Sequence, residues 1–222
     1  MAHLYLVPQW FFGFDIAMEL VFAIIAMALA FFTYRIYKVS EDEEVKLFGL
    51  AFVLISISYI VWAAINLFML DKLSDGIREI SLNNLMSINY ILTLVHMGLF
   101  IVGIITLAYA HLEIKSAKAY YILTGLALIG LVSSSIPWIT YQLLAIFLLS
   151  TIVYHYAVDH SCYKNKKARA IFIAFLLLLL SRIDFLFTAN SAFAYIFGHI
   201  LELTAYYLIL VGLVANIKGC KK

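Results

Sequence analysis

Seven long stretches of the chain are almost continuously apolar, and short polar segments separate them. A helix that crosses the roughly 30 Å hydrocarbon core of a bilayer needs about 20 mainly apolar residues. The seven stretches have about this length and cover residues 11–37, 47–70, 85–110, 119–136, 138–158, 169–187 and 192–216. The pattern therefore predicts an all-α, polytopic membrane protein in which residues 1–222 form a single seven-transmembrane-helix bundle.

The composition agrees with this architecture and argues against other classes. Hydrophobic residues make up 65% of the chain and charged residues only 13%, which leaves little polar surface for a soluble domain. The formal net charge is +2, so the basic residues do not indicate binding to nucleic acid. The partner that this composition predicts is the lipid bilayer.

The distribution of basic residues predicts the orientation of the bundle. Loops on the cytoplasmic side of a membrane carry an excess of Lys and Arg. Twelve of the fifteen basic residues fall in one set of connections: Arg35, Lys38, Lys46, Lys115, Lys118, Lys164, Lys166, Lys167, Arg169, Lys218, Lys221 and Lys222. This places the N-terminus outside the cell membrane and the C-terminus in the cytoplasm. Cys162 and Cys220 then lie on the reducing side, where no disulfide is expected.

Four ionisable residues lie inside the apolar stretches: Glu19, His96, His199 and Glu202. A titratable side chain in hydrocarbon costs several kcal/mol unless it is paired or hydrated, so its presence there calls for a function or a partner. The polar residues of the last stretch recur every three or four positions and share one helical face: Ser191, Tyr195, His199, Glu202 and Tyr206. Shorter polar series occur in the first two stretches, with Asp15 and Glu19 in one and Ser56, Tyr59 and Asn66 in the other.

These residues are predicted to lie at one depth. A rise of 1.5 Å per residue places the four ionisable side chains about 10–15 Å below the external boundary of the membrane. Gln142 and Arg182 fall in the same outer half, whereas a pore would distribute its polar residues over the full thickness. We therefore expect a polar cup, open to the exterior, that binds a small ligand or ion. Its candidate ligand-binding residues are Glu19, Asn66, His96, Arg182, His199, Glu202 and Tyr206.

The same residues fit other interpretations. Two imidazoles and two carboxylates suit zinc, so His96, His199, Glu19 and Glu202 form a candidate metal set. His96 and His199 also fit the two axial ligands of haem b in an apolar, aromatic setting. The structural alternative is a buried hydrogen-bond network in which Arg182 neutralises Glu202 or Glu19.

Catalysis and transport have less support in the sequence. No nucleophile–base pair is evident from the spacing of residues, so an enzyme of this kind would depend on a bound metal. A transporter is expected to contain internal repeats, broken helices and a polar path to the cytoplasm, and the sequence shows none of these.

The last stretch resembles the last helix of the membrane-associated sensor domains of the third type. These are seven-helix modules that in prokaryotes usually precede PAS, histidine-kinase or diguanylate-cyclase domains. The resemblance is carried by YIFGHILELTAYYLILVGLV, in which Gly198, His199, Tyr206 and Tyr207 match the family pattern. The first stretch, FDIAMELVFAII, also resembles the opening of that family through Glu19.

The chain departs from the family at three polar positions. Glu202 stands where the family has Lys, Asp15 replaces a His, and Asn66 lies where the second helix of the family has a His. The resemblance implies a sensory or ligand-binding bundle in a prokaryotic plasma membrane. Only NIKGCKK follows the last stretch, so we expect a stand-alone sensor-like or receptor-like protein that signals through a separate cytoplasmic partner.

Overall fold

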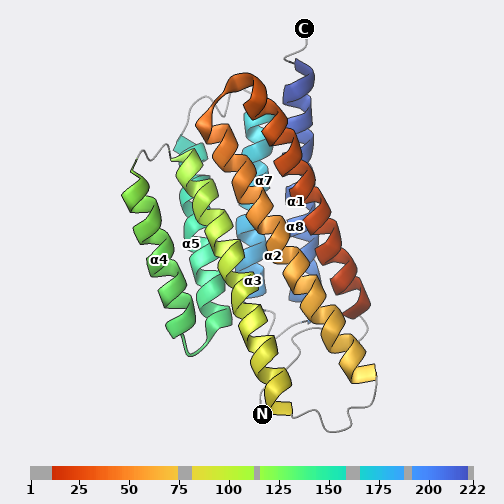
Figure 1. Ribbon diagram of the computed structural model, residues 1–222. Coiled ribbons are helices and arrows are strands. Elements are labelled where there is room, and N and C mark those ends of the chain that lie inside the picture. Colours follow the sequence, from red (N-terminus) through yellow and green to blue (C-terminus); the bar gives the residue numbers. More distant parts are fainter. Residues whose placement is uncertain (1–11, 75–81, 113–115, 159–165, 188–191, 220–222) are drawn as a thin grey trace.

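The computed structural model describes residues 12–74, 82–112, 116–158, 166–187 and 192–219. In these ranges the chain forms helices and no strand (Figure 1). The helices are α1 (Phe12–Ser40), α2 (Glu43–Ser74), α3 (Leu82–His111), α4 (Ala117–Ser133), α5 (Pro137–Val158), α7 (Lys166–Phe185) and α8 (Ala192–Gly219). Each helix contains most of one predicted apolar stretch, so the all-α class is confirmed. Cys162, Ser191 and Cys220 lie outside the described residues.

Six of the described helices form a closed ring. The order around the ring is α1, α2, α3, α5, α7 and α8, and α8 packs against α1. α4 lies outside the ring, against α3 and α5 (Figure 1). Successive helices run in opposite directions, so α1, α3, α5 and α8 begin at the same end of the bundle. We call this end the lower end, as it appears in Figure 1, and the opposite end the upper end.

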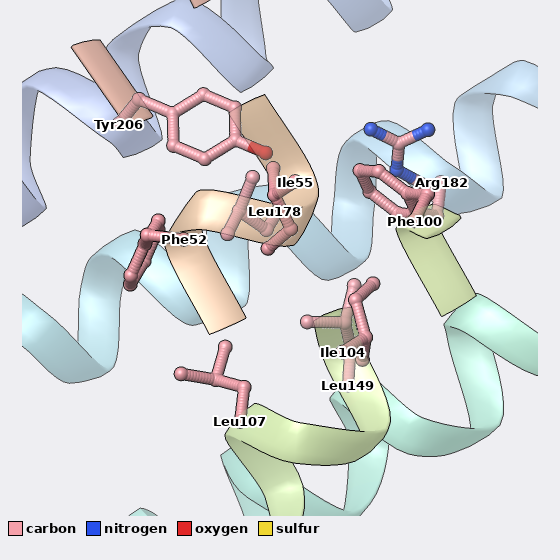
Figure 2. Close-up of a pocket in the computed structure, with 9 residues that line it drawn as sticks. All are labelled: Phe52, Ile55, Phe100, Ile104, Leu107, Leu149, Leu178, Arg182 and Tyr206. Atoms are coloured by element: carbon pink, nitrogen blue, oxygen red, sulfur yellow. The ribbon is translucent and has the colours of Figure 1, made fainter. Parts of the chain in front are cut away.

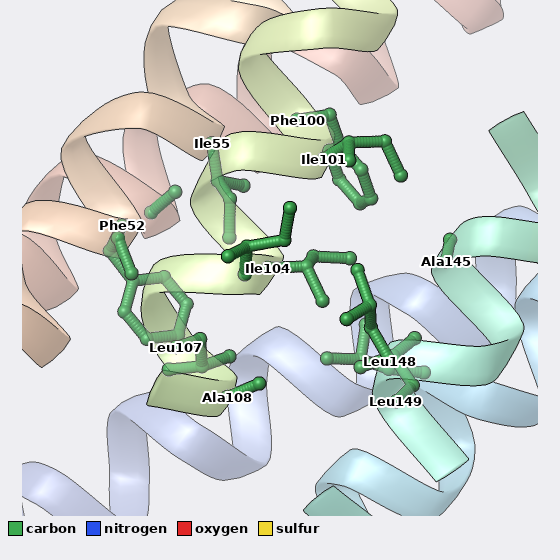
Figure 3. Close-up of a cluster of buried hydrophobic side chains, with 14 of the residues drawn as sticks. Phe52, Ile55, Phe100, Ile101, Ile104, Leu107, Ala108, Ala145, Leu148 and Leu149 are labelled. Atoms are coloured by element: carbon green, nitrogen blue, oxygen red, sulfur yellow. The ribbon is translucent and has the colours of Figure 1, made fainter. Parts of the chain in front are cut away.

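Apolar side chains fill the middle and upper part of the ring. Phe52 and Ile55 of α2 pack there against Phe100 and Ile104 of α3 (Figure 3). A Cβ atom at Gly103 would lie 2.8 Å from Cγ1 of Ile55, a separation that real contacts do not allow. The missing side chain therefore lets α2 and α3 approach closely, as small residues do between membrane helices.

Five helices in the described part of the chain are long and apolar enough to cross a membrane. These segments are Gly13–Ser40, Glu43–Phe68, Ile88–His111, Pro137–Val158 and Phe193–Leu213. α4 is apolar but has only 17 residues. α7 has basic residues in its first turn and Arg182 and Asp184 near its end, so the uncharged stretch between them, residues 170–181, is shorter than a membrane span requires. Length and composition therefore define a protein with several membrane-spanning helices.

The outer surface of the bundle is also apolar. Ile24, Ile129 and Phe147, from α1, α4 and α5, each expose more than half of their side-chain surface. Side chains of this kind on three different helices would be unfavourable in water but suit contact with lipid acyl chains. The surface is therefore compatible with a lipid bilayer around the ring.

Candidate functional site

The polar residues predicted to form a site are buried in the lower half of the ring, where they separate into two groups. The first, the lower group, comprises Asp15, Glu19, Asn66, Tyr195 and His199. The second, the central group, lies farther along α8 and comprises Tyr59, Tyr141, Arg182, Glu202 and Tyr206. Every one of these side chains except Asn66 is buried. Of the seven predicted ligand-binding residues, six therefore fall into the two groups, and only His96 has a separate environment.

The lower group joins α1, α2 and α8 through the side chain of Asp15. Tyr195 donates its hydroxyl hydrogen to Asp15, and Nε2 of His199 lies 3.2 Å from the same carboxyl oxygen. The amide nitrogen of Asn66 lies 3.3 Å from the other oxygen of Asp15 and 3.1 Å from Glu19 Oε1. Asp15 and Glu19 are one helical turn apart, so both carboxyl groups face the same space.

The central group is built around an ion pair between α7 and α8. Arg182 pairs with Glu202 and donates hydrogen bonds of 3.2 Å to the hydroxyls of Tyr141 and Tyr59. Tyr59 in turn donates to Glu202 and lies 3.1 Å from the hydroxyl of Tyr206. One positive and one negative charge are therefore enclosed together and surrounded by hydroxyl groups, which is the arrangement that makes a buried ion pair tolerable.

Aromatic rings complete the surroundings of Arg182. Its guanidinium carbon lies 4.4 Å from the ring centroid of Phe100 and 5.3 Å from that of Phe185. A desolvated guanidinium gains energy from such contacts because the ring face carries partial negative charge. Gly198 permits the approach of Phe185, since a Cβ atom there would lie 2.8 Å from the ring. The central group is thus a neutral, packed element that connects α2, α5, α7 and α8.

Phe22 of α1 separates the two groups. Its ring stacks on His199 of the lower group with a centroid distance of 5.8 Å. It also lies 5.3 Å from the ring of Tyr59 and 5.9 Å from that of Tyr206, both in the central group. Phe22 is fully buried, so its ring fills the space between the two groups and contacts both.

His96 lies beside the central group and is held by α2. Its Nδ1 is 2.9 Å from the backbone oxygen of Ser58, and its ring stacks on Trp62 at 4.8 Å. The hydroxyl oxygen of Ser58 lies at the same distance of 2.9 Å, so Nδ1 either donates to the carbonyl oxygen or accepts from the hydroxyl. The ring centroids of Tyr141 and Tyr59 lie 6.0 Å and 6.5 Å from that of His96, and these contacts connect His96 to the central group.

The predicted four-residue zinc set is wrong for the described residues, where no three His, Cys, Asp or Glu side chains are placed to hold a metal ion. The reason is that residues at one depth have different partners. Glu202 pairs with Arg182, Glu19 with Asn66, and His96 with Ser58. The haem alternative stays a prediction. His199 contacts Phe22, Phe185 and Tyr195, whereas His96 contacts Trp62 and two tyrosines.

A small cavity lies above the central group, between it and the apolar core (Figure 2). The cavity has a volume of about 10 Å³, which is enough for roughly one water molecule. Its walls are the apolar side chains of α2, α3, α5 and α7, together with Arg182 and Tyr206. In Figure 2 the terminal nitrogens of Arg182 point away from Leu107 and Leu149 on the opposite wall. The cavity thus marks the boundary where polar packing gives way to apolar packing.

Several polar residues of the site were not among the predicted ligand-binding residues. Asp15, Tyr59 and Tyr195 lie on the polar helical faces that the sequence shows, so that signal could have placed them among the ligand-binding residues. Tyr141 had no such signal, because its neighbours on α5 are mostly apolar. Gln142 is fully buried, and within the described residues neither polar atom of its amide has a hydrogen-bond partner.

Comparisons of the chain with protein-family models, with curated proteins and with solved structures found no match. The fold and the site therefore define the class: an all-helical protein with several apolar helices able to cross a membrane and two buried polar groups in the lower half of its helix ring. The resemblance to membrane-associated sensor domains stays a prediction.

Proposed function

We propose that this protein is a seven-helix membrane sensor of a prokaryotic plasma membrane. In this proposal the lower end faces the exterior, the lower group binds a small ligand, and the upper end acts on a separate cytoplasmic partner. The ring arrangement supports α7 as a sixth span, because α7 packs between α5 and α8 and shares their environment, and α4, which packs against α3 and α5 outside the ring, would be the seventh. The concentration of basic residues in the connections at the upper end supports the orientation.

The charge of the lower group is the observation that carries the proposal. A network that serves only stability is expected to balance its buried charges, as the central group does with Arg182 and Glu202. The lower group instead places two carboxyl groups beside one basic side chain, His199. No other basic side chain in the described ranges pairs with Asp15 or Glu19. Such an excess of buried acid suits the binding of a positively charged ligand.

The structure offers a route by which occupancy of the lower group reaches the rest of the bundle. α8 carries His199 of the lower group and, one turn farther on, Glu202 of the central group. A shift of α8 that follows a change at His199 therefore alters the Arg182–Glu202 pair and the position of α7. Phe22 provides a second connection through α1.

The proposal is tested by thermal unfolding of the protein in lipid nanodiscs. The probes are sodium, calcium, zinc and putrescine at neutral pH, and a series of buffers from mildly acidic to alkaline pH, so that the proton is one of the probes. A ligand present at 100 times its Kd stabilises the folded state by about 2.7 kcal/mol. We expect one probe to raise the Tm of the wild type. The variants His199→Gln and Tyr195→Phe should each reduce the apparent affinity for that probe by about tenfold or more.

Thr93→Val is the matched control, because Thr93 bonds within its own helix at 2.7 Å to the backbone oxygen of Asn89. This variant is expected to retain the full response to the probe. The sensor proposal is contradicted if no probe, the proton included, shifts the Tm. It is equally contradicted if the shift is the same size in the wild type and in both variants of the lower group.

A further inference from the structure

We infer that the ligand of the lower group is a proton, held between the carboxyl groups of Asp15 and Glu19. This inference rests on the proposed function and names the ligand of the same site. Its starting point is the geometry of the two acids, which lie one turn apart on α1 and share the amide nitrogen of Asn66, at 3.3 Å from Asp15 Oδ2 and 3.1 Å from Glu19 Oε1. Ionised carboxylates only accept hydrogen bonds, so a bond between two carboxyl groups requires one of them to carry a hydrogen.

The donors around the two acids do not replace that hydrogen. The Asn66 amide nitrogen carries two hydrogens but lies 3.1 to 3.3 Å from three carboxyl oxygens, two of Glu19 and one of Asp15. Tyr195 donates its hydroxyl hydrogen to Oδ1 of Asp15, and Nε2 of His199 lies 3.2 Å from the same oxygen. The two hydrogens of the Asn66 amide are thus shared among three carboxyl oxygens, more than they can serve at once. A proton on the pair supplies the hydrogen that this arrangement requires.

The charged groups nearby favour the same conclusion. The helices packed against α1 are α2 and α8. These helices and α7 carry polar and titratable groups that face the two acids or lie one layer above them. The groups are Asn66, Tyr59, Tyr195, His199, Glu202 and Arg182. Arg182 pairs with Glu202, so His199 is the basic group in contact with the two acids within the described ranges. Two negative charges so close together in a medium of low polarity repel strongly, and a shared proton removes that repulsion.

The burial of the pair selects the proton among cationic ligands. Asp15 is 0% exposed and Glu19 is 1% exposed, so the carboxyl groups are enclosed by protein. Oxygen-bound cations such as sodium or calcium need several ligands and room for an ion, whereas a proton needs neither. Release of the proton leaves a second negative charge beside Phe22 and His199, and this weakens the contacts of α1 with α2 and α8.

Infrared difference spectroscopy of the protein in nanodiscs tests the inference. A protonated carboxyl group has a carbonyl stretch that differs from that of a carboxylate and shifts in heavy water. We expect the wild type to show this band at neutral pH and to lose it as the pH rises. Glu19→Gln and Asp15→Asn should lack the band, while Glu43→Gln, at an exposed salt bridge with Lys46, should retain it. Absence of the band from the wild type, or its persistence in both site variants, overturns the inference.

The pH dependence of unfolding provides a second readout. The folded state gains stability from the shared proton, so the Tm of the wild type should fall as the pH rises through the titration of the pair. Glu19→Gln carries a permanent neutral amide, folds without a proton, and should give a Tm that changes much less over that range. An unchanged slope in Glu19→Gln overturns the inference. A Tm response to another probe that depends on His199 would then leave the sensor proposal standing without the proton.

Discussion

Replacing Glu202 by alanine is expected to lower the free energy of unfolding by about 3–5 kcal/mol, because Arg182 would remain buried without a counter-charge. The guanidinium group has no route to solvent, since Arg182 is only 4% exposed. Tyr59 would also lose the carboxylate that accepts its hydroxyl hydrogen. Equilibrium unfolding in mixed micelles, followed by the helical circular dichroism signal, measures the effect.

The matched control removes both charges together. In the double variant Arg182→Met with Glu202→Met, no charge is left unpaired, and the stability should lie within about 1 kcal/mol of the wild type or above it. A single variant Glu202→Ala that unfolds like the wild type would show that Arg182 and Glu202 are not paired in the membrane. A double variant as unstable as the single one would show that their packing, and not their charge, holds α7 to α8.

Replacing Gln142 by methionine is expected to raise the free energy of unfolding by about 1–3 kcal/mol. Both polar atoms of this amide are buried on α5 without a partner in the described residues, so the folded state bears their full desolvation cost. Methionine has a similar length and no group that requires a hydrogen bond, so it fills the same space. The same unfolding measurement applies.

The adjacent tyrosine is the control for this effect. Tyr141→Phe removes a hydroxyl that accepts a hydrogen bond of 3.2 Å from Arg182, and it should lower the stability by about 0.5–1.5 kcal/mol. Neighbouring substitutions on one helix are thus expected to have opposite signs. A loss of stability in Gln142→Met would show that the amide has a bonding partner in the membrane.

The helices could be predicted from the sequence because hydrophobic length is a strong signal. All seven apolar stretches correspond to helices in the described ranges, with boundaries shifted by a few residues. α4 and α7 meet the requirements for a membrane span less fully than the other helices. The seven stretches were identified by their average hydropathy, which is high for α7 because its middle is apolar. Its charged residues lie at the two ends, with basic residues in the first turn and Arg182 and Asp184 in the last turns.

The sequence predicted the depth of the site residues in the bundle but not which side chains contact one another. Polar faces on the first and last stretches located Asp15, Glu19, His199 and Glu202. Which acid Arg182 neutralises depends on how α7 is rotated against α8, and no periodicity within one helix reports that rotation. The zinc set failed for the same reason, because equal depth on different helices does not bring side chains together. Tyr141 depends likewise on the rotation of α5.

One residue in the family resemblance has a physical explanation in the fold. Gly198 lies where α7 and α8 pack together, and its lack of a side chain makes room for the ring of Phe185. Phe185 in turn contacts both Arg182 and His199, at 5.3 Å and 5.1 Å. A glycine at this position is therefore required by the packing of both polar groups, whether or not the chain shares the ligand of that family.

If the lower group acts on the upper end of the bundle, ligand binding must change the distance between the upper ends of two helices. Spin labels at positions 39 and 154 replace the exposed Val39 of α1 and Tyr154 of α5, with Cys162 and Cys220 changed to serine. Electron-spin distance measurements in nanodiscs then compare the wild type with and without the probe that stabilises it. We expect the probe to change the distance distribution and His199→Gln to remove this change. Distributions that are identical in both states would contradict this prediction and leave the two groups as a static network.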